Sequence, residues 1–208
     1  MRHPVWLFDL DNTLHEASRH AFPVIDAAMT HYLMQHLQLD QAGANQLRVH
    51  YWRRYGATLL GLRRHHPHID PQHFLAASHP LDTLLREVHP MPGLRQTLQR
   101  LPGRKILFTN GPHAYAQAML EALRISGEFS GIAAIDTLGL TPKPFSAAYR
   151  RLLRHFGLRA SQCILVEDSV ANLLPARKLG MRTIWLRRGH RQHPAADRTI
   201  RTLAELCR

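Results

Sequence analysis

Two aspartates, Asp9 and Asp11, follow an apolar run near the start of the chain, residues 5–8. The run is rich in strand-forming residues and predicts a short buried strand of a parallel sheet. Two carboxylates at this spacing can hold a hard cation such as Mg²⁺ while one of them remains able to attack phosphorus. Such an attack forms an aspartyl-phosphate, and the neighbouring carboxylate can serve as the general acid and then as the general base. The alternative is an Asp-rich turn without a chemical role.

Other polar residues follow two later apolar runs, and a lysine lies between two prolines. They are Thr109 and Asn110 after residues 105–108, Glu167 and Asp168 after residues 163–166, and Lys143 between Pro142 and Pro144. Parallel strands bring their carboxyl ends to one edge of a sheet, so we expect these side chains to lie near the two aspartates.

Phosphoryl transfer from a monoester requires a nucleophile, an acid and base, a metal site and groups that bind the phosphate. We assign Asp9 as the nucleophile and Asp11 as the general acid and base. The predicted ligands of Mg²⁺ are Asp9, Asp11, Asp168 and Glu167, the last either directly or through water. The predicted phosphate contacts are Thr109, Lys143 and the chain at Leu10 and Asn110, with Lys143 also screening the charge that meets there.

The elements that must position these residues alternate between strand and helix in the second half of the chain. Further strands are expected at 105–109, 163–166 and 183–186, and helices at 93–101, 113–123, 145–156 and 172–179, with a helical turn at 202–206. Pro175 suits only a first helical turn, and the helix containing it is therefore expected to begin at Asn172. This alternation predicts an α/β fold with a mostly parallel sheet covered by helices on both faces.

The segment between the first two strands has helical patterns only. Helices are expected at 23–39, 41–55, 72–77 and 81–88, with the apolar stretch 58–62 and a turn at 65–71 between the second and the third. Gly56 is expected to end the second helix. The segment therefore reads as a helical insert in the α/β core.

The chain has 208 residues, of which 45% are hydrophobic and 20% charged, enough for a core domain that carries a smaller inserted one. Its formal net charge is +12, from 27 basic and 15 acidic residues. The arginines are scattered along the sequence, so binding of nucleic acid is disfavoured as the main role. The positive field can instead attract small phosphorylated substrates.

The two cysteines do not suggest a disulfide framework, and a cytoplasmic location is the default. The start of the sequence lacks a signal-peptide pattern, and no stretch approaches a membrane span. Several of the 16 histidines cluster at residues 65–68, but without cysteine partners they do not match a zinc pattern. The oligomeric state is left open.

The ordered motifs D-L-D-N-T-L, T-N, K-P and V-E-D-S resemble those of the haloacid dehalogenase-like (HAD) hydrolases over nearly the whole chain. The resemblance implies a Rossmann-like catalytic core, residues 1–14 and 92–208, and a mobile helical cap of the C1 type, residues 15–91. True dehalogenases of the family lack the second aspartate, so Asp11 points to phosphate chemistry. Relatives that cleave carbon–phosphorus bonds need a cap lysine, and this chain has no lysine before Lys105.

Residues 55–62, 79–81 and 108–114 resemble the pyrimidine 5′-nucleotidase branch of the family. The resemblance implies a pyrimidine nucleoside 5′-monophosphate as substrate, with Tyr51, Tyr55 and Thr58 as candidate contacts in the cap. For the two tyrosines, packing between cap helices is the favoured role, and stacking on a base is the other. That branch commonly has two aspartates where this chain has Glu167 and Asp168.

Two other functions stay open. The same site could act on a sugar phosphate or phosphoglycolate, either as a phosphatase or as a mutase that returns the phosphate to the sugar. A protein of another class would bind nucleic acid through its positive surface and keep a vestigial site, but the intact set of Asp9, Asp11, Lys143 and Asp168 counts against it.

Overall fold

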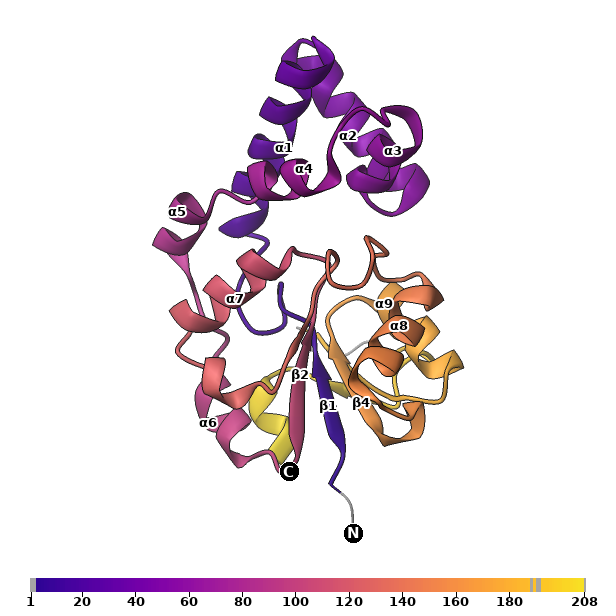
Figure 1. Cartoon of the computed structure of the whole chain (residues 1–208). Coiled ribbons are helices and arrows are strands. Elements are labelled where there is room, and N and C mark those ends of the chain that lie inside the picture. The colour runs from indigo at the N-terminus through magenta and orange to yellow at the C-terminus, as the bar shows by residue number, and fades with distance from the viewer. Residues whose placement is uncertain (1–2, 188, 190–191, 208) are drawn as a thin grey trace. The chain divides into compact units, whose positions relative to one another are not determined.

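The computed structural model describes residues 3–187, 189 and 192–207. The chain divides into two compact units, one formed by Met1–Ala17 with Val88–Arg208 and the other by Ser18–Glu87. We call them the core unit and the insert unit. Figure 1 shows the strands in the core unit and helices alone in the insert unit. Within the described residues, no helix is both long enough and apolar enough to cross a membrane.

The core unit contains a six-stranded sheet in which every pairing is parallel. In chain order its strands are β1 (Val5–Phe8), β2 (Arg104–Phe108), β3 (Ile132–Ala133), β4 (Cys163–Glu167), β5 (Arg182–Leu186) and β6 (Arg198–Ile200). Their order across the sheet is β3-β2-β1-β4-β5-β6. Phe8, the last residue of β1, pairs with Leu107 on one side and Val166 on the other, so the three central strands end within one residue of the same level.

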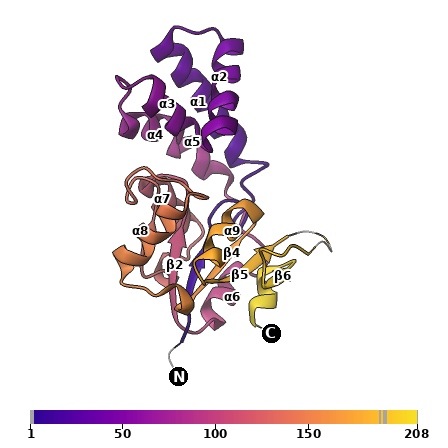
Figure 2. The same cartoon turned by 90° about the vertical axis from the view of Figure 1, so that its right-hand side faces the viewer.

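Helices cover both faces of this sheet (Figure 1), which confirms the predicted α/β fold. They are α6 (Leu94–Arg100), α7 (His113–Ala122), α8 (Ser146–Phe156) and α9 (Val170–Lys178). Figure 2 shows α8 and α9 in front of the strands. On that face Leu7, Ile106 and Leu165 pack in one buried cluster with Tyr149 and Leu173 of the two helices. Burial of this apolar area fixes the strands and hence their polar ends.

The helix that contains Pro175 begins earlier than the sequence predicts. Helix α9 starts at Val170, because the backbone N–H groups of Asn172 and Leu173 both donate to the carbonyl of Ser169. Pro175 therefore lies inside the helix, where it cannot donate to the carbonyl of Ala171. Ala171 is exposed, so water can satisfy that carbonyl, and the missing bond does not end the helix.

The insert unit consists of α1 (Ala21–Leu37), α2 (Gln41–Tyr55), α3 (Thr58–His65), α4 (Pro71–Ser78) and α5 (Leu81–Leu84), followed by a 3₁₀ turn at Leu85–Glu87. Asp40 caps α2 by accepting a hydrogen bond of 2.8 Å from the backbone N–H of Gly43. Gly56 ends the same helix in the left-handed conformation, with φ at 85°. The unit has its own buried core, which includes Leu33, Leu59 and Phe74.

Candidate active site

Three strand ends bring Asp9, Thr109 and Glu167 to one edge of the sheet. The backbone N–H of Asp9 donates to the carbonyl of Val166 at 3.0 Å, and that of Thr109 donates to Ala133 at 3.0 Å. These bonds extend the ladders by one residue beyond β1 and β2, so the positions of the polar side chains are set by the sheet itself. Asp9, Thr109 and Glu167 are all buried.

Lys143 connects the carboxylates of this edge. Its ammonium group donates to Asp9 Oδ1 at 2.6 Å, to Glu167 Oε2 at 2.8 Å and to the carbonyl of Phe108 at 2.8 Å. An ammonium group has three donors, and here each of them has an acceptor. Lys143 is only 2% exposed, so this cation is held inside the protein by two carboxylates.

Burial dominates the electrostatics of the carboxylates. It raises the pKa of Asp9 to about 7, with the charge of Glu167 adding to the rise and that of Lys143 opposing it. Burial likewise raises the pKa of Glu167 to about 7 against the lowering effect of Lys143, and it raises the pKa of Asp168. For Lys143, burial lowers the pKa, but Asp9 and Glu167 outweigh it and hold the pKa above its ordinary value. One lysine does not compensate three carboxylates, so a cation would stabilise their ionised forms.

The donor set of the site fits Mg²⁺. Asp9, Glu167 and Asp168 each offer a carboxylate oxygen, and these oxygens lie within 4.8 Å of one another. Hard cations such as Mg²⁺ prefer such all-oxygen ligands. The carbonyl of Asp168 accepts a 2.7 Å hydrogen bond from Trp185 Nε1, which fixes the chain at this residue. Asp11, predicted from the sequence as a further ligand, is not part of this group of carboxylates.

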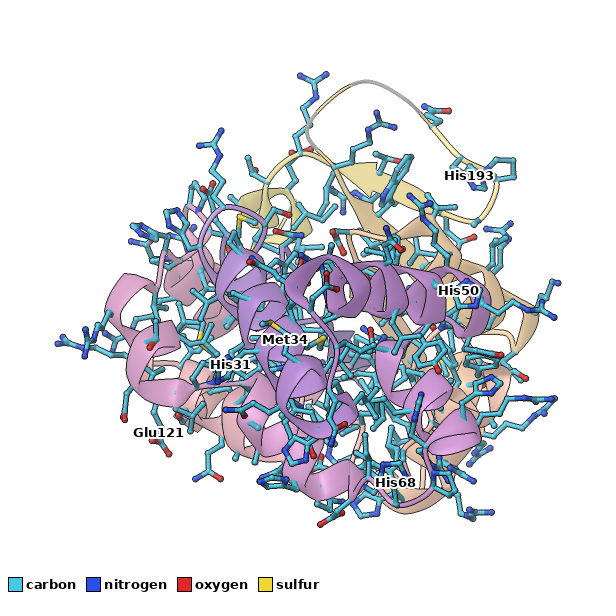
Figure 3. The ribbon with its side chains drawn as sticks, turned by 90° about the horizontal axis from the view of Figure 1, so that it is seen from above. His31, Met34, His50, His68, Glu121 and His193 are labelled. Carbon is cyan, nitrogen blue, oxygen red and sulfur yellow. The ribbon has the colours of Figure 1, made fainter. Side chains whose placement is uncertain are left out.

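The same group is the only one of its kind in the part of the chain that the structure describes. In Figure 3, His31, His50 and His68 of the insert unit lie well apart from one another. The histidines of the insert unit therefore do not form a site of this type within the described residues.

Asp11 is held by two residues that the sequence did not reveal. Its Oδ1 accepts a hydrogen bond of 2.7 Å from the Tyr115 hydroxyl, and it lies 3.0 Å from His15 Nε2. Tyr115 and His15 are buried, whereas the Asp11 side chain is 18% exposed. Burial, followed by the charge of Asp11, holds the pKa of the Tyr115 hydroxyl far above its ordinary value, so Tyr115 remains a donor.

The other site residues predicted in the core unit, Thr109, Asn110 and Leu10, make different kinds of contact. Thr109 Oγ1 accepts from the backbone N–H of Gly111 at 2.9 Å. The side chain of Asn110 binds the backbone of Lys143 twice, receiving its N–H at 2.7 Å and donating to its carbonyl at 3.0 Å. The Leu10 side chain is buried in the core, which leaves its backbone for a phosphate contact. Thr13, not singled out in the sequence, donates to Asp9 Oδ2 at 3.0 Å.

The predicted substrate contacts in the insert unit have partners within that unit. The Tyr51 hydroxyl lies 2.8 Å from His66 Nε2, and that of Tyr55 lies 2.6 Å from His65 Nε2. Thr58 Oγ1 donates to the carbonyl of Arg48 at 3.2 Å. Tyr51 and Thr58 are each only 5% exposed. These contacts fit packing between α2 and α3.

Comparison with known proteins identifies the family. The model of the family described as "Hydrolase: haloacid dehalogenase-like hydrolase" matches residues 5–180. The chain belongs to the haloacid dehalogenase-like hydrolases. The match includes all the carboxylates of the site, Lys143 and the whole helical insert, so the resemblance inferred from the motifs is confirmed at the level of this family.

Two relatives of this HAD hydrolase are named phosphoglycolate phosphatase. The protein of Pseudomonas fluorescens (strain Pf0-1) is 29% identical over 199 residues, which cover 88% of this chain and 69% of the relative. The protein of Rhodospirillum rubrum is 28% identical over 214 residues, covering 92% and 82%. The relatives do not support the pyrimidine nucleotidase branch, to which the sequence motifs pointed.

The HAD hydrolase YfnB of Bacillus subtilis, whose structure was determined with bound magnesium, has a similar fold. The two structures superpose with a TM-score of 0.66 and 16% sequence identity, covering 99% of this chain and 97% of YfnB. At this identity the likeness is one of fold, and it extends over both units of the chain.

Proposed function

We propose that this HAD hydrolase is a Mg²⁺-dependent phosphomonoesterase that acts through an aspartyl-phosphate on Asp9. The observation that carries the proposal is the contact of 2.6 Å between Lys143 Nζ and Asp9 Oδ1, inside a group of three carboxylates. A buried lysine next to a carboxylate screens the charge that builds up when an anionic phosphate approaches. The magnesium bound to YfnB, a protein of the same fold, supports the choice of cation.

The proposed reaction has two steps, in which Asp9 and Asp11 have different roles. In the first, an oxygen of Asp9 forms a bond to phosphorus while the ester P–O bond breaks, and Asp11 gives its proton to the leaving oxygen. In the second, Asp11 takes a proton from water as the water oxygen bonds to phosphorus and the bond to Asp9 breaks. Asp9, Asp168 and Glu167 would hold Mg²⁺, which supplies positive charge for the phosphate oxygens.

The phosphate itself would be bound by hydrogen-bond donors at the carboxyl edge of the sheet. Thr109 Oγ1 is one side-chain donor. Lys143 Nζ, whose three donors are bonded to Asp9, Glu167 and Phe108, would exchange one of these acceptors for a phosphate oxygen. The backbone N–H groups of Leu10 and Asn110 complete the set. The amide of Asn110 holds the backbone of Lys143 and therefore acts on the phosphate through Lys143.

The proposed substrate is a small phosphorylated acid or sugar, with phosphoglycolate as the first candidate. The names of the two relatives support this class over a pyrimidine nucleotide. Tyr51, Tyr55 and Thr58 form their hydrogen bonds within the insert unit, so these contacts do not favour binding of a nucleotide base. We propose that the insert unit is the cap of the enzyme and that it carries the contacts to the leaving group.

The test is release of inorganic phosphate from a panel of phosphoglycolate, glucose phosphates, UMP, CMP, dTMP and AMP in the presence of Mg²⁺. The Asp9→Asn protein serves as the blank, and EDTA removes the metal. We expect release from phosphoglycolate or a sugar phosphate, none from the blank and none with EDTA. Preferential release from pyrimidine nucleotides would overturn the proposed substrate class, and activity in EDTA would overturn the metal requirement.

A further inference from the structure

The proposed acid–base group, Asp11, receives two contacts on one of its oxygens. Tyr115 donates to Asp11 Oδ1 at 2.7 Å, and His15 Nε2 lies 3.0 Å from the same atom. Oδ1 accepts hydrogen bonds both in the ionised carboxylate and in an acid that carries its proton on Oδ2, so the donor in this contact is His15 Nε2. The Tyr115 oxygen lies 3.4 Å from the same nitrogen, and the three groups form a closed triangle.

Backbone contacts around His15 hold this residue in place beside Asp11. His15 forms a parallel bridge to Asp11 and an antiparallel bridge to Pro90. On either side of it, Met91 donates to the carbonyl of Leu14 at 2.9 Å and Glu16 donates to that of His89 at 2.9 Å. The imidazole is 1% exposed and so has little freedom to turn away from Asp11.

The local chain also shapes the position of Tyr115. This residue lies in the first turn of α7, which begins directly after the sequence Asn110-Gly111-Pro112. A Cβ atom at position 111 would lie 2.8 Å from Cδ1 of the Tyr115 ring, closer than real Cβ atoms come. Glycine at this position therefore makes room for the ring beside the strand end that carries Thr109.

We propose that His15 and Tyr115 are positioning residues for Asp11. Together they fix the plane of the carboxylate and occupy Oδ1, so that Oδ2 carries the proton that passes to the leaving oxygen. As the proton leaves Oδ2, the P–O bond breaks and the new bond from phosphorus to Asp9 forms, so charge and atoms balance. This inference rests on the proposed function, because it assigns a task to the acid of that reaction.

The test compares two esters that differ in how much they need an acid. Nitrophenolate leaves p-nitrophenyl phosphate readily without a proton, whereas the phenolate of phenyl phosphate is a stronger base and depends on one. The ratio kcat/KM reports only the steps up to release of the alcohol. For Tyr115→Phe we expect a loss of roughly tenfold in kcat/KM on phenyl phosphate, and less than about threefold on p-nitrophenyl phosphate, since general acids contribute about 10²–10⁴ in all.

Tyr149→Phe is the matched control. Tyr149 is equally buried and its hydroxyl donates at 2.6 Å to the carbonyl of Asn172, so the substitution removes a comparable hydrogen bond elsewhere. We expect it to change kcat/KM on the two esters by the same factor. An equal loss on both esters in Tyr115→Phe, or no loss, would contradict the positioning role.

Substitutions of His15 give an independent test of the same role. His15→Gln keeps a donor near Asp11, whereas His15→Leu removes it, so we expect Gln to retain most of the activity on phenyl phosphate that Leu loses. Circular dichroism and thermal unfolding of each variant exclude loss of the fold as the cause. Equal activity of folded Gln and Leu variants would overturn the role of His15. Failure of the parent to hydrolyse either ester would count against the proposed function instead.

Discussion

Lys143 Nζ lies 2.6 Å from Asp9 Oδ1, although the two residues are 134 positions apart in the chain. The contact joins the end of β1 to the segment that precedes α8, and Glu167 at the end of β4 completes it. Folding of the parallel sheet therefore creates a buried group in which a cation and its carboxylates depend on one another.

We expect Lys143→Met to destabilise the protein and to abolish most of its activity. The substitution leaves Asp9 and Glu167 buried without a compensating cation, a change that costs about 3–5 kcal/mol in comparable pairs. Urea unfolding near neutral pH measures this loss. Lys178→Met is the control, because Lys178 is exposed at the end of α9 and its loss is expected to change stability by less than about 0.5 kcal/mol. Similar stability of the two variants would contradict the account of Lys143.

The metal-free protein is expected to lose stability as the pH rises from about 4 to about 7. Burial raises the pKa of Asp9 and of Glu167 to about 7 from ordinary values of 3.8 and 4.5. Between these values the folded protein binds more protons than the unfolded chain, so the free energy of unfolding falls with rising pH and levels off above about 7. Urea unfolding in EDTA across this range measures the slope.

Glu167→Gln provides the comparison for this pH dependence. It removes one titrating carboxyl and also the charge that helps to raise the pKa of Asp9. The fall in stability between about pH 4 and about pH 7 should therefore be smaller in the variant than in the parent. An equal fall in both proteins would show that other groups cause it. Mg²⁺ is expected to stabilise the parent more at the higher pH, where the carboxylates are ionised.

Asn110→Ala should lower the rate of phosphate release by loosening Lys143. The side-chain amide makes two hydrogen bonds to the Lys143 backbone, at 2.7 and 3.0 Å, and their loss leaves buried groups without partners. We expect kcat to fall about tenfold, with a loss of stability of about 1–3 kcal/mol. Asn45→Ala is the control, since Asn45 accepts a 2.8 Å hydrogen bond from Thr30 within the insert unit. An unchanged kcat in Asn110→Ala would show that the hydrogen bonds of Asn110 are not needed to position Lys143.

Gly61→Ala is expected to destabilise the insert unit. A Cβ atom at this position would lie 2.1 Å from Cγ of Tyr51, a contact that requires α2 and α3 to move apart. Overpacking of this kind typically costs about 1–3 kcal/mol. Gly127→Ala is the matched control, because a Cβ atom there meets nothing within 4 Å. Equal thermal stability of the two variants would contradict the close packing of Tyr51 against α3.

The sequence was sufficient for the central strands and their polar ends, because each of β1, β2 and β4 contains a short run of consecutive apolar residues that is followed by a polar residue. It missed β3 and β6, which have two and three residues, too few for such a run. For α9 the sequence predicts a start at Asn172, because a proline inside a helix is costly, whereas the exposure of Ala171 reduces that cost in the structure.

The hydrogen-bond partners of Asp11 could not be predicted from the sequence, for a different reason. Tyr115 lies 104 positions from Asp11, and helical periodicity explains a buried tyrosine on α7 without any reference to a carboxylate. His15 lies only four positions away, but a single histidine after the motif gives no sign of the direction of its ring. Only the folded chain brings these side chains together.

Trapping the covalent intermediate tests most directly whether Asp9 is the nucleophile. The parent protein is mixed with Mg²⁺ and phosphoglycolate, quenched in acid during turnover, digested and analysed by mass spectrometry, with Asp9→Asn treated in the same way. We expect one added phosphoryl group on the peptide that contains Asp9, lost on treatment with hydroxylamine and absent from the variant. Turnover without any phosphorylated peptide, or a phosphoryl group on another residue, would contradict the assignment of Asp9 as the nucleophile.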